Sequence, residues 1–584
     1  IFEHDAREKS SQRWEKTVTN HGRPYRRRLL LVAAFALGAG KPAAAGAQSA
    51  APPPSIQAAM QHMYGGDPRG AATILEALTK ADPRNVRAWS LLALSYRQSG
   101  DLERARATYD KALALNPKSA DAMFNLAGVW ALEGKNDSAF AWLAKAKASR
   151  NYDMTQLEVD TAYASLRHDP RYASMLPTAK DLADPFVEHA TIIREFDGDS
   201  TGDQFGWIAR SLGDVDHDGM EDFVTSAPTK AIGGENAGRV YVYSSGTGML
   251  LWSADGTPGS QLGTGVESAG DVDGDGAQDV VAGAPYAGRA YVYSGTNGHV
   301  LLTLRAENDS DAFGTHVSTA GDVDHDGHAD IFVGAPNNNA KGTGAGRAYV
   351  FSGKDGHLLL TLTGERAGDA FGSTVAGFSD SARTLLVVGA PSAGAGKVGR
   401  TYVYDRLSTT PKFIIESDAT GRALGAMFVS VPGDVNGDGV PDVYASDFTN
   451  AAKGASTGRI YVHSGRDGKR LLTLTGEGAG EGFGIGPATT GDVDHDGRAD
   501  LVIGSWQYAG AAASGGRVYL YSGRDGHLLK TITDRIPGDT FGFDAVGIGD
   551  VDHDGTVDLL LTAAWSGVHG NHSGRIFIVS SGVK

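Results

Sequence analysis

The chain of 584 residues contains no cysteine, which excludes disulfide staples and cysteine-ligated metal sites. It also has no basic face. Its 53 Lys and Arg stand against 69 Asp and Glu, a formal net charge of −16, and this argues against a nucleic-acid partner. No apolar run after Leu37 reaches the roughly 18 residues that suggest a membrane-spanning helix, so we expect no transmembrane segment beyond a signal peptide.

The N-terminal region has the features of an export signal. Arginines between residues 23 and 28 precede the apolar run Leu29–Leu37, and Ala45-Gly46-Ala47 offers small residues for cleavage. We interpret residues 23–47 as a signal peptide, 1–22 as a disordered leader or mis-extended start, and 48–54 as a linker. The expected location is secreted, periplasmic or cell-surface. A retained N-terminal anchor is the alternative.

Residues 55–180 follow a 34-residue period of small and large apolar side chains. The clearest copy runs from Trp89 to Pro117, and further copies lie 34 residues before and after it. This length and spacing resemble the tetratricopeptide repeat. The resemblance implies three helical hairpins, and we expect a capping helix pair over Leu157–Leu176. Such arrays commonly present a concave face to a peptide or neighbouring domain, which would be a second docking surface.

Between residues 214 and 558 one nine-residue pattern, D-x-[D/N]-x-D-G-x-x-D, occurs six times. Each copy places four oxygen-bearing side chains in one tight turn, and its glycine permits the sharp bend. Hard oxygen ligands without Cys or His favour calcium over zinc. Metal-free polar turns are the alternative, but bare carboxylates crowded together repel one another. The pattern therefore predicts a calcium-loop protein.

The acidic pattern is part of a longer repeat of about 55 residues. The interval between Asp322 and Asp434 is doubled and contains a degenerate unit, in which Phe378-Ser379-Asp380 replaces the acidic loop. Seven units result. Each contains an F-G or L-G pair, apolar runs on both sides of the acidic loop, and a G-R-x-Y-V-Y-S-G segment, which together indicate four short strands per unit.

These repeated words resemble the FG-GAP (VCBS) repeat of bacterial proteins and of the integrin alpha-subunit head. The F-G pairs include Phe205-Gly206, Phe313-Gly314 and Phe541-Gly542, and Gly283-Ala284-Pro285 is one of the G-A-P words. The resemblance covers residues 186–584 and implies an all-β seven-bladed propeller after the all-α array. The last unit has three strands, so we expect residues 189–196 to supply its fourth.

By this resemblance, and by analogy with other calcium loops, positions one, three, five and nine of each loop donate side-chain oxygens and position seven a backbone carbonyl. The cofactor predicted is Ca²⁺, at about six sites. The histidines at position four are expected to face solvent. The predicted ligands are Asp214, Asp216, Asp218, Met220 and Asp222; Asp271, Asp273, Asp275, Ala277 and Asp279; Asp322, Asp324, Asp326, His328 and Asp330; Asp434, Asn436, Asp438, Val440 and Asp442; Asp492, Asp494, Asp496, Arg498 and Asp500; and Asp550, Asp552, Asp554, Thr556 and Asp558.

The resemblance also implies that partners bind the face opposite the calcium loops, through the connections between strands 2 and 3 and between strands 4 and 1. Four aromatic residues fall near those connections and are ligand-face candidates: Trp207, Phe448, Trp506 and Trp565. They could contact a peptide or a sugar ring. Packing between blades is the alternative, because aromatic residues often fill blade seams.

No catalytic constellation is recognisable in the sequence: neither G-x-S-x-G nor H-E-x-x-H occurs. The leading hypothesis is an exported, calcium-binding interaction or adhesion protein with a protein or glycan ligand. The alternatives are an extracellular enzyme acting on glycan or lipid, with its site on the propeller face, and a carbohydrate-binding module. No obligate second subunit is identifiable.

Overall fold

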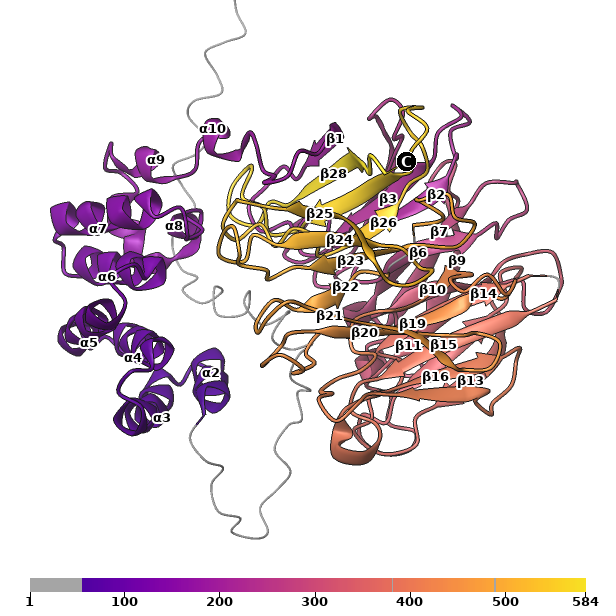
Figure 1. Ribbon diagram of the computed structural model, residues 1–584, viewed down its shortest axis with the longest axis horizontal. Helices are drawn as coiled ribbons and strands as arrows, with labels where there is room; N and C mark the ends of the chain where they lie inside the picture. Colours follow the sequence, from indigo (N-terminus) through magenta and orange to yellow (C-terminus); the bar gives the residue numbers. More distant parts are fainter. Residues whose placement is uncertain (1–54, 381, 488–489, 584) are drawn as a thin grey trace, which may run out of the picture. The chain divides into compact units, whose positions relative to one another are not determined.

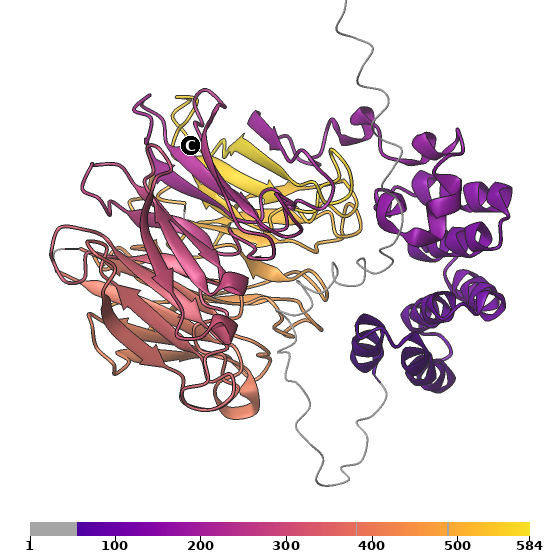
Figure 2. The ribbon, with the colours of Figure 1, turned by 180° about the vertical axis from the view of Figure 1, so that it is seen from behind.

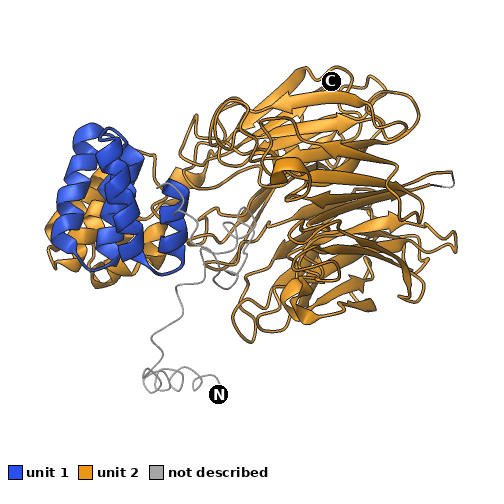
Figure 3. Ribbon diagram, turned by 90° about the horizontal axis from the view of Figure 1, so that it is seen from below, with its two compact units in different colours: residues 1–125 blue, residues 126–584 orange. Residues whose placement is uncertain are grey.

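The computed structural model describes residues 55–380, 382–487 and 490–583. The predictions for residues 1–54, which include the signal peptide and the linker, lie outside these ranges. The chain divides into two compact units, residues 1–125 and 126–584 (Figure 3). Each unit is described by itself below. In the described part of the chain, no helix has the length and apolar character needed to cross a membrane.

The helical repeats begin in the first unit. Side-chain caps define several helix starts: Asp67, Asn85 and Asp101 each accept a backbone N–H of the first turn. The starts of α4 and α6, and of α5 and α7, are 34 residues apart (120 − 86 and 136 − 102), so the helices follow the period of the sequence. The helices are α2 (Ile56–Tyr64), α3 (Pro68–Ala81), α4 (Val86–Gln98), α5 (Leu102–Leu115), α6 (Ala120–Leu132), which crosses the boundary between the units, and α7 (Asn136–Ala148).

The segment after α7 differs from the predicted capping pair. It forms helical segments of one or two turns: α8 (Gln156–Val159), η2 (Thr161–Leu166), α9 (Tyr172–Met175) and α10 (Ala179–Leu182). The capping helix pair expected over Leu157–Leu176 was therefore wrong. Its apolar residues are still used, because Leu157, Tyr163 and Leu166 are fully buried.

Seven four-stranded antiparallel sheets follow, and each of the first six uses consecutive strands (Figures 1 and 2). This confirms the predicted seven-bladed propeller. The blades are β2 (Ala209–Gly213), β3 (Asp222–Ala227), β4 (Arg239–Tyr243), β5 (Leu250–Asp255); β6 (Val266–Gly270), β7 (Asp279–Ala284), β8 (Arg289–Tyr293), β9 (Val300–Arg305); β10 (Val317–Gly321), β11 (Asp330–Ala335), β12 (Arg347–Phe351), β13 (Leu358–Thr363); β14 (Thr374–Ser379), β15 (Thr384–Ala390), β16 (Arg400–Asp405), β17 (Phe413–Glu416); β18 (Val429–Gly433), β19 (Asp442–Asp447), β20 (Arg459–His463), β21 (Arg470–Thr475); β22 (Phe483–Ile485), β23 (Leu501–Ser505), β24 (Arg517–Tyr521), β25 (Leu528–Thr533); and β26 (Ala545–Gly547), β27 (Asp558–Ala563), β28 (Arg575–Ser580) with β1 (Ile192–Asp197).

Strand β1 closes the ring, as the sequence predicted. It pairs antiparallel with β28, with Phe196 opposite Ile576, and so supplies the fourth strand of the last blade. Just before it, Val187 donates to the carbonyl of Thr533 on β25, and the carbonyl of Pro185 accepts from Arg535. One short stretch of chain therefore joins the sixth and seventh blades.

The core lies between neighbouring blades. Every residue of the second strand is buried in β3, β7, β11 and β27, because these strands are covered on both faces. The phenylalanines of the F-G pairs fill the seams; Phe313, Phe371, Phe483 and Phe541 are at most 1% exposed. The F-G words are thus packing residues that repeat with the blade.

Candidate metal loops and the opposite face

The six acidic loops connect strands 1 and 2 of their blades, so they lie at one end of the antiparallel sheets. Three short 3₁₀ turns, η3 (Pro285–Ala287), η4 (Asp309–Asp311) and η5 (Ala395–Lys397), occur in the connections at the other end. In five of the six loops the last aspartate opens strand 2; in the sixth blade Asp500 directly precedes strand 2. The polarity of the blades therefore gathers all six loops on one face of the propeller.

The first loop shows how the turn is held. The carboxylate of Asp214 accepts the N–H groups of Asp218 and Gly219, both at 3.0 Å, and Asp216 accepts that of Asp218 at 3.1 Å. Position four adopts a left-handed conformation, with φ of 61° at His217, and Gly219 at position six has φ of 92°. These conformations explain the glycine at position six and the His or Gly at position four.

The ninth position is the buried anchor of each loop. Asp222, fully buried, accepts the N–H groups of Val215 and Asp216 with one oxygen and that of Ser245, in the hairpin between strands 3 and 4, with the other. Burial raises the pKa of Asp222 to about 6, and the nearby carboxylate of Asp216 adds to the rise. The same causes raise the pKa of Asp558 to about 7. Such carboxyls gain most from a nearby cation.

The carboxylates are close enough to share an ion. In five loops three of them offer oxygens within 4.8 Å of one another: Asp214, Asp216 and Asp218; Asp271, Asp273 and Asp279; Asp322, Asp324 and Asp330; Asp492, Asp494 and Asp500; and Asp550, Asp552 and Asp554. The remaining loop, in the fifth blade, has Asn436 at position three in place of a carboxylate. In the last loop Oδ1 of Asp558 is buried without a hydrogen-bond partner in the protein. The donor set and this orphaned oxygen fit a hard divalent cation.

The remaining loop positions are also placed by the structure. The position-four histidines His217, His325, His495 and His553 are all exposed. The position-seven residues are half-buried or buried, and the ring of His328 lies 2.7 Å from the carbonyl of Val272 in the neighbouring loop. Adjacent loops are further linked by the N–H of Ala329, which donates to the carbonyl of Asp271.

The degenerate fourth blade replaces the acidic loop by a basic contact. Asp380 accepts the N–H groups of Ala382 and Arg383, and its carboxylate pairs with the Arg383 guanidinium at 3.1 Å. Arg383 also donates to the carbonyl of Gly439 in the loop of the fifth blade. In the one blade that lacks an acidic loop, the guanidinium of Arg383 therefore supplies a positive charge at the corresponding place.

The opposite face carries a belt of ion pairs that the sequence did not reveal. In six of the seven blades the arginine that opens strand 3 pairs with a carboxylate at the end of strand 4 of its own blade or in the connection that enters its blade. Examples are Arg347 with Glu307 at 2.6 Å and Arg517 with Glu477 at 2.8 Å. Arg575 pairs with Glu195 of β1. The recurring G-R pair before strand 3 was the available signal, since its arginine recurs without an apolar role.

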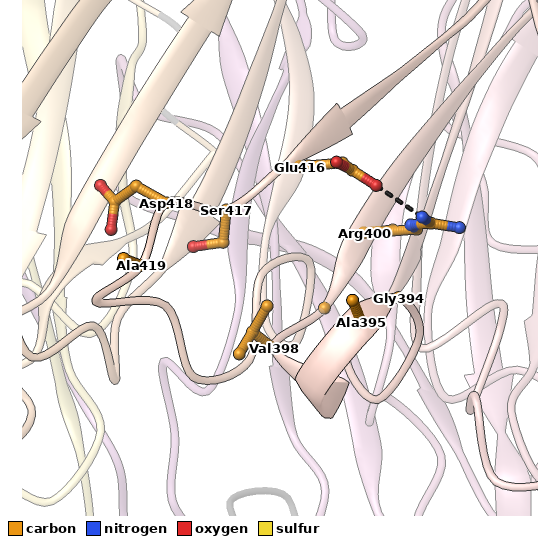
Figure 4. A pocket seen from close by; sticks show the side chains of 9 residues that line it. Gly394, Ala395, Val398, Arg400, Glu416, Ser417, Asp418 and Ala419 are labelled. Carbon is orange, nitrogen blue, oxygen red and sulfur yellow. Dashed lines mark hydrogen bonds and ion pairs between the residues drawn. The ribbon is translucent and has the colours of Figure 1, made fainter.

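A half-open cavity of about 260 Å³ lies on this face in the fourth blade. Figure 4 shows Ala395 and Val398 of the connection between strands 2 and 3, and Glu416 at the end of strand 4 with Ser417 to Ala419 just beyond it. Arg400 bridges Glu416 and Glu365 at its margin. The cavity combines a small apolar wall with carboxylates and a guanidinium.

Three of the four aromatic candidates form one buried cluster with Phe543. The ring centroids of Trp207 and Phe543 are 4.8 Å apart, those of Trp506 and Trp565 5.4 Å, and those of Trp207 and Trp565 5.9 Å. All four candidates are at most 8% exposed, and Phe448 is also buried. This arrangement favours the alternative of packing between blades.

The chain covers part of this face with its own residues. Glu158 accepts the N–H of Asn571, and Thr155 accepts from the Asn571 side chain at 3.0 Å. Asn151 accepts the N–H of Ala513 in the sixth blade. The connections between strands 2 and 3 of the last two blades are therefore partly covered, whereas the cavity in the fourth blade is half-open.

The repeats match known families. Residues 56–119 and 91–153 match the tetratricopeptide repeat, residues 205–243, 264–300 and 313–351 the FG-GAP repeat, and residues 434–503 an FG-GAP-like repeat. The chain thus combines tetratricopeptide repeats with an FG-GAP propeller, as the repeated words predicted.

Similar proteins include mouse phosphatidylinositol-glycan-specific phospholipase D, 34% identical over 181 residues, and chicken integrin alpha-V, 30% identical over 207 residues. Integrin alpha-4 of Xenopus laevis is 30% identical over 179 residues. These matches cover 27%, 31% and 28% of this chain and only 21%, 19% and 17% of the respective relatives. The chain therefore spans only about a fifth of the length of these relatives.

Proposed function

We propose that this chain is an exported, calcium-binding interaction protein whose propeller recognises a protein ligand and whose tetratricopeptide repeats offer a second docking surface. The observation that carries the proposal is the separation of two faces. Six acidic loops gather at one end of the blades, and the connections at the other end form a cavity. The relation to integrin alpha subunits supports a protein ligand.

Calcium would be held in each loop by the oxygens of positions one, three, five and nine and by the carbonyl of position seven. The ion would neutralise carboxylates that are otherwise crowded, among them the buried anchors Asp222 and Asp558. Its role in the proposal is structural, because it would fix the end of strand 1 to the start of strand 2. Millimolar extracytoplasmic calcium could fill even weak sites of this kind.

The ligand is proposed to bind the face that bears the cavity of the fourth blade. Val398 and Ala395 offer apolar contact there, while Glu416 and Asp418 offer carboxylates. Mixed surfaces of this sort suit a peptide with apolar and basic side chains. The last two blades contribute less, since Thr155 and Glu158 contact the connection of the seventh blade and Asn151 contacts that of the sixth.

The test compares two substitutions at opposite ends of one blade. Ala419→Arg would fill the cavity, and Thr409→Arg would place the same side chain in the exposed hairpin between strands 3 and 4. Arrays of secreted and surface proteins, and of glycans, are probed with each purified chain in calcium. We expect protein ligands whose binding is lost in Ala419→Arg and kept in Thr409→Arg. Binding to glycans alone, or loss in both variants, would contradict the proposed face.

A further inference from the structure

The end of the propeller that carries the acidic loops also presents a ring of exposed apolar side chains. Among the described propeller residues eight large apolar side chains are exposed, and six of them lie at or next to the first residue of a fourth strand. That position follows the hairpin between strands 3 and 4, at the same end of the antiparallel sheet as the loop between strands 1 and 2. The six side chains, with exposed fractions from 39% to 65%, are Met249, Leu250, Val300, Leu358, Ile414 and Leu528.

These side chains are separate points at the rim of the propeller. The first strands of most neighbouring blades pack against one another, so the fourth strand forms the outer edge of each blade. Apart from the neighbours Met249 and Leu250, each of the six side chains belongs to a different blade. Protein partners usually bury one contiguous apolar patch, and side chains on separate blades do not form one. Single apolar side chains at the same end of successive blades fit a fluid surface, into which each can insert by itself.

The same hairpins carry exposed basic side chains in the third to sixth blades. They are Lys354 in the third blade, Arg406 in the fourth, Arg466 and Lys469 in the fifth, and Arg524 in the sixth. Exposed apolar side chains with lysine and arginine beside them suit a membrane surface that contains anionic phospholipid. The apolar groups can enter the headgroup region, and the basic groups are attracted by the negative surface potential.

The hairpins are attached to the acidic loops by hydrogen bonds. In five blades a backbone N–H of the hairpin donates to Oδ1 of the aspartate at position nine of the loop, at 2.9 to 3.1 Å. In the first blade, for example, the donor is Ser245 and the acceptor is Asp222. An ion held in the loop would therefore also fix the hairpin and the rim residue that follows it.

Three of the basic side chains pair with the carboxylate at position five of the loop in their own blade. The pairs are Lys354 with Asp326 at 3.7 Å, Arg466 with Asp438 at 3.2 Å, and Arg524 with Asp496 at 3.9 Å. These carboxylates are also proposed calcium ligands. Calcium would compete with the basic groups for them and leave the ammonium and guanidinium groups available to an anionic surface. Without calcium the crowded carboxylates of the loops would repel such a surface.

We propose that the rim at the loop end of the propeller docks on a membrane surface containing anionic phospholipid when calcium is bound. The inference rests on the proposed function, because the acidic loops must first hold calcium. Met249, Val300 and Leu358 enter the headgroup region, and Arg466 and Arg524 attract the anionic lipid. The opposite face, with the cavity of the fourth blade, then points away from the membrane and stays open to a ligand.

The experiment measures co-sedimentation of the full chain with vesicles of phosphatidylcholine alone and of an equal mixture of phosphatidylcholine and phosphatidylserine, in calcium and in chelator. We expect binding to the mixed vesicles in calcium and its loss in chelator. The triple substitution Met249→Ser, Val300→Ser and Leu358→Ser should weaken this binding about tenfold at an unchanged melting temperature. The double substitution Arg466→Gln and Arg524→Gln should weaken it about tenfold as well.

Tyr286→Ser is the matched control, because Tyr286 is 63% exposed in η3, at the opposite end of the second blade, and it should leave vesicle binding unchanged. Elemental analysis of calcium in the same samples separates two kinds of failure. If the calcium-loaded chain does not bind the mixed vesicles, or if the triple variant binds them as tightly as the wild type, the membrane surface is overturned while the proposed function stands. If the chain holds no calcium, both are overturned. Self-association of the calcium-loaded chain without vesicles, lost in the triple variant, would assign the rim to a second copy and equally overturn the proposal.

Discussion

Phe196 of the entry strand β1 lies opposite Ile576 of β28, and this pairing closes the ring. The Phe196 ring also contacts Phe223 of the first blade, with centroids 4.9 Å apart. One side chain thus joins the last blade to the first. A propeller without such a seal would expose two sheet edges.

Phe196→Ala should therefore destabilise the whole propeller, by about 3 kcal/mol, as for other buried phenylalanines replaced by alanine. The measurement is the propeller transition in calorimetry with calcium present. Leu250→Ala is the control: Leu250 belongs to the fourth strand of the first blade but is 45% exposed, and little change is expected. Equal effects of both substitutions would show that the contact between Phe196 and the first blade does not contribute to the stability of the propeller.

Removal of the bound metal should lower the stability of the propeller, and each acidic loop should account for one bound ion. We expect the purified chain to bind about six calcium ions by elemental analysis and to melt at a markedly lower temperature in chelator. Asp322→Asn alters one loop and should reduce the count by one. Asp380→Asn in the degenerate fourth blade is the matched control and should leave the count unchanged. No bound calcium in the wild-type chain would contradict the proposed role of the loops.

The repeated sequence motifs made the fold predictable, but the contacts between residues of different repeats could not be predicted. F-G pairs, acidic loops and hairpin turns recur because every blade has the same local needs, and the missing fourth strand of the last unit followed from counting. The charged network of Arg210, Glu267 and Asp544 has no such signal. These residues belong to three blades and differ from the residues at equivalent positions, so only the closed ring brings them together.

The short helices after α7 and the burial of the aromatic candidates could also not be predicted from the sequence. Leu157 and Leu166 have helical spacing, but their burial is satisfied by segments of one or two helical turns rather than by a helix pair. Trp506 and Trp565 follow strand 2 in their blades, and their spacing does not tell a ligand surface from a seam. The neighbouring ring of Phe543 decides the matter, and its position depends on the ring closure.

The buried histidine His316 should make stability depend on pH. Burial, with a contribution from the charge of Arg210, lowers its pKa to about 3, and its Nε2 is buried without a partner. In the unfolded chain the imidazole binds a proton below about pH 6.5. In the folded chain the imidazole of His316 binds a proton only below about pH 3. Its contribution to the free energy of unfolding is therefore complete above pH 6.5. Between pH 6.5 and pH 3 this contribution falls by about 1.4 kcal/mol for each pH unit.

His316→Asn should flatten this dependence, because the amide oxygen can still accept the N–H of Val375 but does not titrate. The measurement compares the free energy of unfolding of both chains between pH 4 and 7, in calcium. The difference between the chains isolates His316 from the carboxyls of the loops, which titrate in both. Parallel curves for the two chains would contradict the assignment.

The network around Arg210 allows the sharpest test of packing at the centre of the ring. Arg210 is 4% exposed, pairs with Glu267 at 2.8 Å and donates to Asp544, which is fully buried. Arg210→Met would leave Asp544 buried without its counter-charge, at an expected loss of about 3–5 kcal/mol in the free energy of unfolding. The double substitution Arg210→Met with Asp544→Leu removes the fully buried one of the two orphaned carboxylates, leaves only the partly exposed Glu267 without its partner, and should recover most of that loss. If the double variant is no more stable than the single one, the cost lies in the lost shape of the arginine rather than in the uncompensated carboxylate.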